Sequence, residues 1–355
     1  MSFITNIRSV AKYESKILVR SWFFRIFTLL AVVFLGFFNF AMMLMEDNFG
    51  LWFAKSVSSN IPYLNLLLLN TGQAVVAVFL SSEFLKRDKK LDTSEVFYVR
   101  PLSNAEYVVG KIWGNLRVFL FLNLLVLAIV LAFNFMASGI AVDLQAYAVY
   151  FFLISLPTLI FIIGLSIFLM LVLRNQALTF ILLLGYIGLT LFYIQDKFYY
   201  LFDYMVYNLP LFKSTIVGFS SLELILNHRA IYFFAGLGFI FFTIFLFKRL
   251  PNARRSHYPW LFLSFCMFLL MVTAGFRHVR SILWEGEMRA LYTSINNKYV
   301  YEPKMAIDYY DISVEQKSET IRSVVGMEGT ALAASEVFIF CLNPGLRVEG
   351  GKDGE

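Results

Sequence analysis

The 355-residue chain is too apolar for a soluble globular protein: 59% of its residues are hydrophobic and only 15% are charged, whereas soluble domains average about 45–50% apolar and about 25% charged residues. The net charge of +6 comes from basic residues beside apolar runs, which argues against a nucleic-acid-binding domain. The two cysteines lie in unlike surroundings and the three histidines are isolated in sequence, so neither a disulfide framework nor a metal cluster is predicted.

Residues 1–25 predict an amphipathic helix lying along the membrane surface, an elbow before the first span. Arg8, Lys12 and Lys16 recur four residues apart on one side of such a helix. The opposite, apolar face is formed by Phe3, Ile7, Val10, Ile17, Leu18 and Phe24.

Seven apolar runs then follow, each long enough to cross a bilayer core of about 30 Å, which takes about 20 helical residues. They cover residues 26–45, 61–82, 112–135, 147–173, 177–194, 231–247 and 258–276. The predicted fold class is therefore an all-α polytopic membrane protein. Pro157 predicts a kink in the fourth run. Arg117 lies near the start of the third run, so its side chain can place the charged group at the membrane surface.

Four amide side chains lie inside the second and third runs: Asn65, Asn70, Gln73 and Asn123. Polar side chains within a membrane face other helices or a cavity. These residues are candidate lining residues of a translocation path. The alternative is that they only join helices to one another through hydrogen bonds.

The polar stretch 83–111 between the second and third runs is rich in Lys and Arg, which predicts that it lies on the cytoplasmic side. Arg100 and Pro101 predict a turn. Ser103 followed by Glu106 has the spacing of a capping box, which predicts that a helix begins there and continues into the third span.

This stretch resembles the coupling segment of type 2 ABC transporter permeases. The family pattern is a basic-acidic pair, a Thr followed by an acidic residue, Pro-(Leu/Val)-Ser, and Gly-Lys at the third span. The matching positions are Arg87-Asp88, Thr93 with Glu95, Pro101-Leu102-Ser103 and Gly110-Lys111. Asp92 stands where the family usually has Gly before the Thr.

The resemblance implies a six-span permease module over residues 26–247, whose coupling segment docks on a separate ATP-hydrolysing subunit. The residues implied to make that contact are Arg87, Asp88, Thr93, Glu95, Arg100, Pro101, Ser103 and Lys111. An ordinary basic cytoplasmic loop is the alternative interpretation.

Residues 195–229 form an aromatic link between the fifth and sixth spans, too apolar for a water-exposed loop, and predict short interfacial or re-entrant helices. The resemblance implies that these helices close an outward exit. A simple aromatic belt is the alternative.

The distribution of basic residues predicts a cytoplasmic N-terminus and an external C-terminus. Sixteen basic residues lie on one side of the spans and four lie on the other, namely Lys55, Lys197, Lys213 and Arg229. The resemblance places the protein in the bacterial plasma (inner) membrane.

The tail, residues 277–355, predicts short strands, as in the alternation of Tyr310, Ile312 and Val314 and in the run 337–342. It resembles the opening strands of the β-domain of gluzincin-type zinc aminopeptidases. Because so few strands cannot bury a sheet face, we expect an incomplete and poorly ordered segment.

The chain lacks His-Glu-x-x-His and the phosphate-binding G-x-x-x-x-G-K-S/T motif, so no enzyme activity, metal or other cofactor is predicted. The expected partners are an ABC ATPase subunit, a second permease module of the same or a different kind, and the lipid bilayer, but not nucleic acid. A non-transporting anchor for an external peptidase-like domain is the alternative function. An ion-coupled transporter is disfavoured because the predicted spans contain no Asp or Glu.

Overall fold

The computed structural model describes most of the chain as two separate units. One contains residues 1–215 and 219–278, and the other contains residues 216–218 and 279–355. The described residues are 3–44, 58–82, 102–136, 142–194, 196–214, 218–219, 221–247, 258–302, 304–317, 320–334, 338–340, 342 and 346–351.

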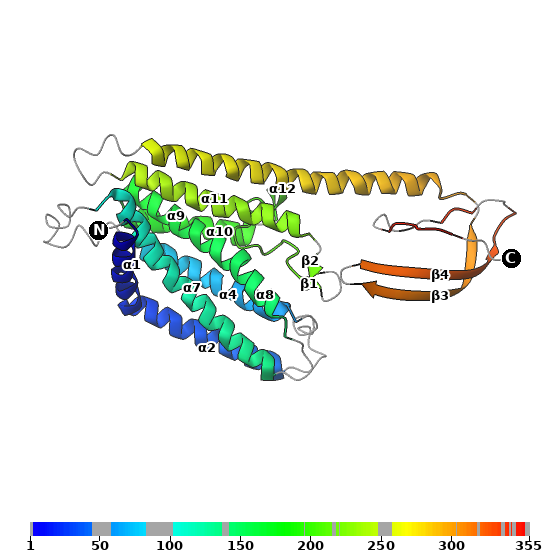
Figure 1. Cartoon of the computed structure of the whole chain (residues 1–355), viewed down its shortest axis with the longest axis horizontal. Coiled ribbons are helices and arrows are strands. Elements are labelled where there is room, and N and C mark those ends of the chain that lie inside the picture. The colour runs from blue at the N-terminus through cyan, green and yellow to red at the C-terminus, as the bar shows by residue number, and fades with distance from the viewer. Residues whose placement is uncertain are drawn as a thin grey trace. The chain divides into compact units, whose positions relative to one another are not determined.

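The first unit is a helical bundle. Its helices are α1 (Phe3–Arg20), α2 (Trp22–Leu44), α4 (Asn60–Ser82), α7 (Asn104–Met136), α8 (Leu144–Tyr150), α9 (Leu156–Leu173), α10 (Gln176–Leu189), α11 (Leu222–Leu246) and the start of α12 (Tyr258–Lys298). Figure 1 shows α1 lying across one end of the bundle, while α2, α4, α7 and α9 run along it.

Within the described part of the chain, seven helical segments are long and apolar enough to cross a membrane. They overlap the seven predicted runs one by one, so the prediction of a multi-pass helical membrane protein is confirmed at this level. The apolar side chains that α2 leaves exposed, such as Leu29, Val33 and Phe37, fit a surface that faces lipid.

Three helices extend beyond the predicted runs. Helix α7 begins at Asn104, as the capping box predicts, although its apolar run begins at 112; α11 begins at Leu222 rather than 231, and α12 continues to Lys298 rather than ending at 276. In the first two cases the added turns contain charged residues that are buried by packing, namely Glu106, Lys111 and Arg229. A prediction from hydropathy ends a span at a charged residue, because hydropathy contains no information about the partners that allow the charge to be buried.

The fourth span is irregular just before Pro157. Between α8 and α9 the chain forms a π turn, Phe151–Ser155, and Pro157 occupies the first turn of α9. A second π turn, Thr190–Ile194, follows α10, and a 3₁₀ turn, Phe198–Tyr200, opens the link to α11. The two-residue strands β1 (Lys213–Ser214) and β2 (Gly218–Phe219) lie later in that link.

Helices α9 and α11 approach each other closely in the core. A Cβ atom added to Gly164 would lie 2.7 Å from the carbonyl oxygen of Gly236, and one added to Gly236 would lie 2.7 Å from that of Ile160. The two backbones therefore touch directly, as small residues permit in membrane bundles.

The second unit contains a β-hairpin of β3 (Met305–Lys317) and β4 (Thr320–Ala331), paired antiparallel with Ile312 opposite Val325. The predicted strand through Tyr310, Ile312 and Val314 is confirmed. The strand predicted over 337–342 is not found in its described residues 338–340 and 342, and β4 was not predicted. The hairpin residues are mostly exposed.

Candidate functional site

Six of the eight predicted coupling residues lie outside the described residues: Arg87, Asp88, Thr93, Glu95, Arg100 and Pro101. Ser103 and Lys111 are described. The backbone N–H of Ser103 donates to Oε2 of Glu106 at 2.6 Å, and the N–H of Glu106 donates to Oγ of Ser103 at 3.1 Å. The predicted capping box is thus confirmed, and it fixes the point where the loop becomes α7.

Lys111 points toward α1 instead of into solvent. Its Nζ lies 3.8 Å from Oε2 of Glu14 and 5.0 Å from the ring centre of Tyr107, and the residue is only 4% exposed. A buried ammonium needs such a partner because isolated burial of a charge is costly. In this arrangement Lys111 joins two helices.

Further polar contacts hold α1 against the first turns of α7. Asn6 donates to Oε1 of Glu106 at 2.9 Å. Arg117 donates to the hydroxyl of Ser15 at 2.5 Å and to the carbonyl oxygen of Ala11 at 2.8 Å. Arg117 is therefore bound to the elbow helix, a partner that sequence spacing did not reveal.

Glycine makes the close approach of the two helices possible. A Cβ on Gly110 would lie 2.7 Å from Cβ of Val10, and one on Gly114 would lie 2.7 Å from Cβ of Glu14. These glycines are four residues apart, so they lie on one face of α7. We refer to the contacts among Asn6, Ala11, Glu14, Ser15, Glu106, Gly110, Lys111, Gly114 and Arg117 as the α1–α7 joint.

Three of the four candidate lining residues meet in one cluster. Asn70 donates to Oδ1 of Asn123 at 2.9 Å, and Asn123 donates to Oε1 of Gln73 at 2.8 Å. Ser155 of the π turn donates to the same Oδ1 of Asn123 at 2.8 Å. This central polar cluster links α4, α7 and the fourth span.

Asn65, the fourth candidate, forms a separate reciprocal pair with Asn39 of α2. Asn39 donates to Asn65 at 2.7 Å and Asn65 donates back at 3.1 Å. Both residues are almost completely buried, as are those of the central polar cluster. In this single chain the amides therefore connect helices, and a role in lining a path stays a prediction.

Arg229 lies inside α11 and is 2% exposed, although the sequence placed it at the end of the aromatic link, before the sixth span. Its guanidinium donates to the carbonyl oxygens of Leu153 at 2.6 Å, Tyr204 at 2.9 Å and Ile154 at 3.4 Å, and to the hydroxyl of Thr158 at 2.8 Å. One side chain thereby joins α11, the π turn of the fourth span and the aromatic link.

Pro157 removes the donor that one of these acceptors would have in a regular α-helix. In a regular helix the N–H of residue 157 would bond to the carbonyl oxygen of residue 153, but proline has no N–H. The oxygen of Leu153 accepts from Arg229 instead. The kink residue that the sequence predicts is therefore part of the Arg229 site.

Two histidines that are isolated in sequence meet beside the same link. The ring centres of His228 and His278 are 5.0 Å apart, and their Nε2 atoms contact the carbonyl oxygens of Tyr200 at 3.0 Å and Tyr199 at 2.9 Å. A carbonyl only accepts, so each Nε2 carries the proton. Phe198, Tyr199 and Tyr200 all have positive φ of 52–61°, which costs energy for residues other than Gly, and the histidines hold two of these residues.

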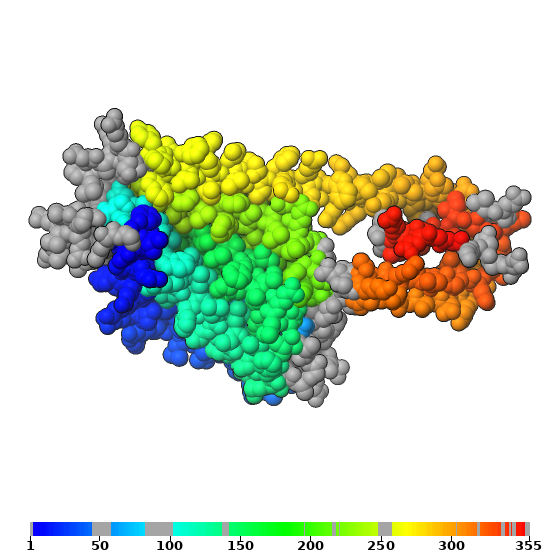
Figure 2. Space-filling view, in the orientation of Figure 1, coloured from blue at the N-terminus to red at the C-terminus, as the bar shows by residue number. Residues whose placement is uncertain are grey.

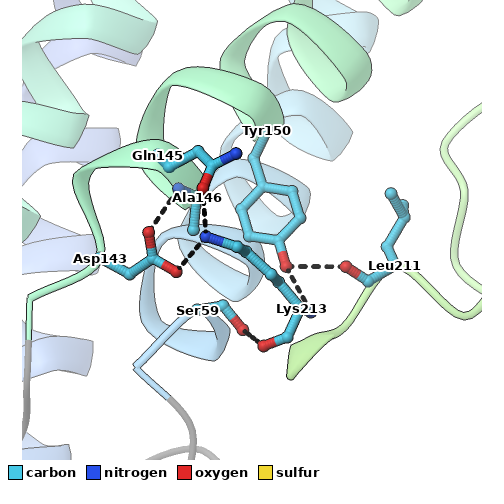
Figure 3. A network of polar contacts seen from close by, with 7 residues as sticks. All are labelled: Ser59, Asp143, Gln145, Ala146, Tyr150, Leu211 and Lys213. Atoms are coloured by element: carbon cyan, nitrogen blue, oxygen red, sulfur yellow. Dashed lines mark hydrogen bonds and ion pairs between the residues drawn. The ribbon is translucent and has the colours of Figure 1, made fainter. Parts of the chain in front are cut away.

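The last part of the link is held to the bundle by its backbone (Figure 3). The hydroxyl of Tyr150 donates to the carbonyl oxygen of Leu211 at 2.7 Å and accepts from the N–H of Lys213 at 3.3 Å. Ser59 donates to the carbonyl oxygen of Lys213 at 2.9 Å. The link is therefore bonded to the starts of both α4 and the fourth span.

The same network contains an ion pair. Nζ of Lys213 lies 2.7 Å from Oδ2 of Asp143 and 2.8 Å from Oε1 of Gln145 (Figure 3). Burial alone would raise the pKa of Asp143, but the hydrogen bonds from Lys213 and from the N–H of Ala146, together with the Lys213 charge, outweigh burial and lower this pKa. Asp143 is therefore held ionised at neutral pH.

No family model, curated protein or solved structure matches this chain. The described residues contain no group of three or more His, Cys, Asp or Glu side chains that could hold a metal ion.

Proposed function

We propose that this chain is the membrane subunit of an ABC exporter in a bacterial plasma membrane, with its N-terminus in the cytoplasm. A separate ATPase subunit supplies the energy, and a second permease module completes the transporter. The proposal is supported by the resemblance of segment 83–111 to a coupling segment and by the seven helices, among the residues that the structure describes, that are suited to crossing a membrane.

The α1–α7 joint is the observation that carries the proposal. The segment that would receive force from an ATPase leads directly into the capping box at Ser103, and the next turns of α7 contact α1 through buried charges and close backbone contacts. A displacement of that segment is therefore transmitted to two helices at once, because close-packed interfaces move as units rather than deforming.

The aromatic link at the far end of the bundle is the proposed exit element. Arg229, the histidine pair and Tyr150 tie it to the fourth span, α11 and α12. In this conformation the central polar cluster is closed between helices. For Asn65, Asn70, Gln73 and Asn123 to contact a substrate, α2, α4, α7 and the fourth span have to separate, which is the change that ATP-driven movement would supply.

The test is co-purification with an ABC ATPase expressed together with this chain. Replacing residues 92–101 by a Gly-Ser linker of equal length should abolish co-purification while leaving membrane insertion intact. Deletion of the hairpin 305–331 is the control and should leave the complex intact. Undiminished co-purification of the linker variant would contradict the proposal.

A non-transporting anchor for an external domain is the alternative, and the β3–β4 hairpin favours it. Tyr310, Ile312 and Val314 lie on one side of β3 and remain largely exposed, as expected for a surface that contacts another protein segment. If the chain is such an anchor, deletion of the hairpin 305–331 should abolish its function in cells. Replacement of residues 92–101 by the Gly-Ser linker should leave that function intact.

A further inference from the structure

The exposed face of α1 carries positive charge alone. Arg8, Lys12, Lys16 and Arg20 are exposed and follow one another at intervals of four residues, which places them along one side of the helix. Glu14 is the one acidic residue of α1, and it is 3% exposed and paired with Lys111 at 3.8 Å. We call the four exposed cations the basic ridge.

The joint with α7 fixes the direction in which this ridge points. Ala11, Ser15 and Leu18 are buried on the other side of α1, and the close contacts with Gly110 and Gly114 leave no room for the helix to roll. The ridge therefore lies permanently at the surface of the first unit, where α1 is visible in dark blue in Figure 2. Like charges four residues apart repel one another, and an anionic partner would relieve that repulsion.

The surroundings of the ridge indicate a membrane surface. Only Ser21 separates α1 from α2, which is long and apolar enough to enter the bilayer, so the last turn of α1 lies at the level of lipid headgroups. Tyr13 is 64% exposed and Trp22 is 75% exposed, and Tyr and Trp side chains favour that level. An acidic protein surface would account for the charge but not for the direct continuation of α1 into a helix that is suited to crossing a membrane.

We infer that the basic ridge binds the anionic headgroups of the bilayer in which the chain is embedded, and so enriches anionic lipid next to α1. A Lys or Arg close to an anionic membrane surface contributes up to about fivefold in binding. The inference does not depend on the proposed transport function, because it needs neither a substrate nor an ATPase.

The test measures which lipid lies next to Trp22. The other four tryptophans are replaced by Phe, and the full chain is reconstituted in phosphatidylcholine vesicles that contain brominated phosphatidylglycerol or, separately, brominated phosphatidylcholine. Bromine quenches a neighbouring tryptophan. We expect the brominated anionic lipid to quench Trp22 several-fold more effectively than the brominated zwitterionic lipid, with the preference falling in high salt because exposed charges are then screened.

Charge variants identify the cause. Arg8→Gln, Lys12→Gln, Lys16→Gln and Arg20→Gln combined should bring the ratio of quenching by the two lipids close to one, whereas Arg8→Lys, Lys12→Arg, Lys16→Arg and Arg20→Lys combined should retain the preference for the anionic lipid. Arg174→Gln is the matched control, since Arg174 is an exposed cation that belongs to neither α1 nor α7, and it should change nothing. Equal quenching by the two lipids in the parent chain would overturn the inference, as would a preference that survives the four Gln substitutions.

Discussion

Arg229 illustrates how a charge inside a membrane bundle can serve structure. Its guanidinium offers five N–H donors in a planar arrangement, and four contacts to Leu153, Ile154, Tyr204 and Thr158 use them. Charged side chains in membranes are expensive unless such partners exist. The residue therefore depends on backbone oxygens of the π turn and of the aromatic link.

Replacement of Arg229 by Met should destabilise the chain. A buried acceptor without a partner costs about 1–3 kcal/mol, while hydrogen bonds between membrane helices average about 0.6 kcal/mol, so we expect a loss of about 2–4 kcal/mol in the free energy of unfolding, measured with denaturant in lipid-detergent mixtures. Arg277→Met is the control: Arg277 pairs with Glu223 at 3.1 Å, but both side chains are largely exposed, so its loss should cost less than about 1 kcal/mol. Equal losses in the two variants would contradict this role.

Asp143 predicts an acid-sensitive contact. Its pKa is lower in the folded chain than the ordinary value of about 3.9, so its contribution to stability is complete above about pH 4 and is lost as the pH falls through the folded-state pKa. Thermal unfolding from pH 7 to pH 2.5 should show parent and Asp143→Asn chains converging at the acid end. If the difference in melting temperature between the parent and Asp143→Asn chains stayed constant over this pH range, the ion pair with Lys213 would be excluded as the source of that difference.

Single residues were predictable where their partners are near in sequence. The Ser103–Glu106 capping box is contained in four residues, and it was predicted. His228 and His278 are 50 positions apart, and Glu14 meets Lys111 across 97 positions, so only the folded chain brings them together. No periodicity contains that information, which is why these contacts, and the burial of Arg229, were missed.

At the scale of helices, apolar length was sufficient to predict the existence of the spans but not their ends. The extra turns of α7 and α11 are stabilised by tertiary contacts of polar residues, and the extension of α12 to Lys298 lies in sequence that mixes charged, polar and apolar residues. At 1.5 Å per residue, the 41 residues of α12 measure about 60 Å, about twice the thickness of a bilayer core.

The α9–α11 contact should tolerate no added methyl group. Gly236→Ala places a Cβ 2.7 Å from backbone atoms of Ile160 and Phe161, which do not move as a side chain would, so we expect about 1–3 kcal/mol of destabilisation from overpacking. Gly185→Ala in α10 meets nothing within 4 Å and should be neutral or stabilising, since Ala favours a helix over Gly. The comparison is made by thermal unfolding, and a neutral Gly236→Ala would show that the helices are less closely packed.

At the scale of the whole chain, the basic residues predict an orientation that accessibility can test. In a chain whose two cysteines are changed to Ser, Lys197→Cys should react with a membrane-impermeant maleimide on intact cells, whereas Lys89→Cys should react only after the membrane is opened. The physical reason is the preference of Lys- and Arg-rich loops for the cytoplasmic side. If Lys89→Cys reacted on intact cells and Lys197→Cys did not, the topology would be the inverse of the predicted one. The coupling proposal would then lose its basis, because segment 83–111 would lie outside the cell.

Pro157 and Arg229 also constrain how this sequence can diverge. A substitution that gives position 157 an N–H adds a competitor for the oxygen of Leu153, and loss of the guanidinium removes the side-chain donor to that oxygen. The two positions are 72 apart in the chain yet share one acceptor, so their effects should be non-additive. Sequences that diverge from this chain are then expected to keep both Pro157 and Arg229 or to replace both. Where both are replaced, the fourth span should form a regular helix.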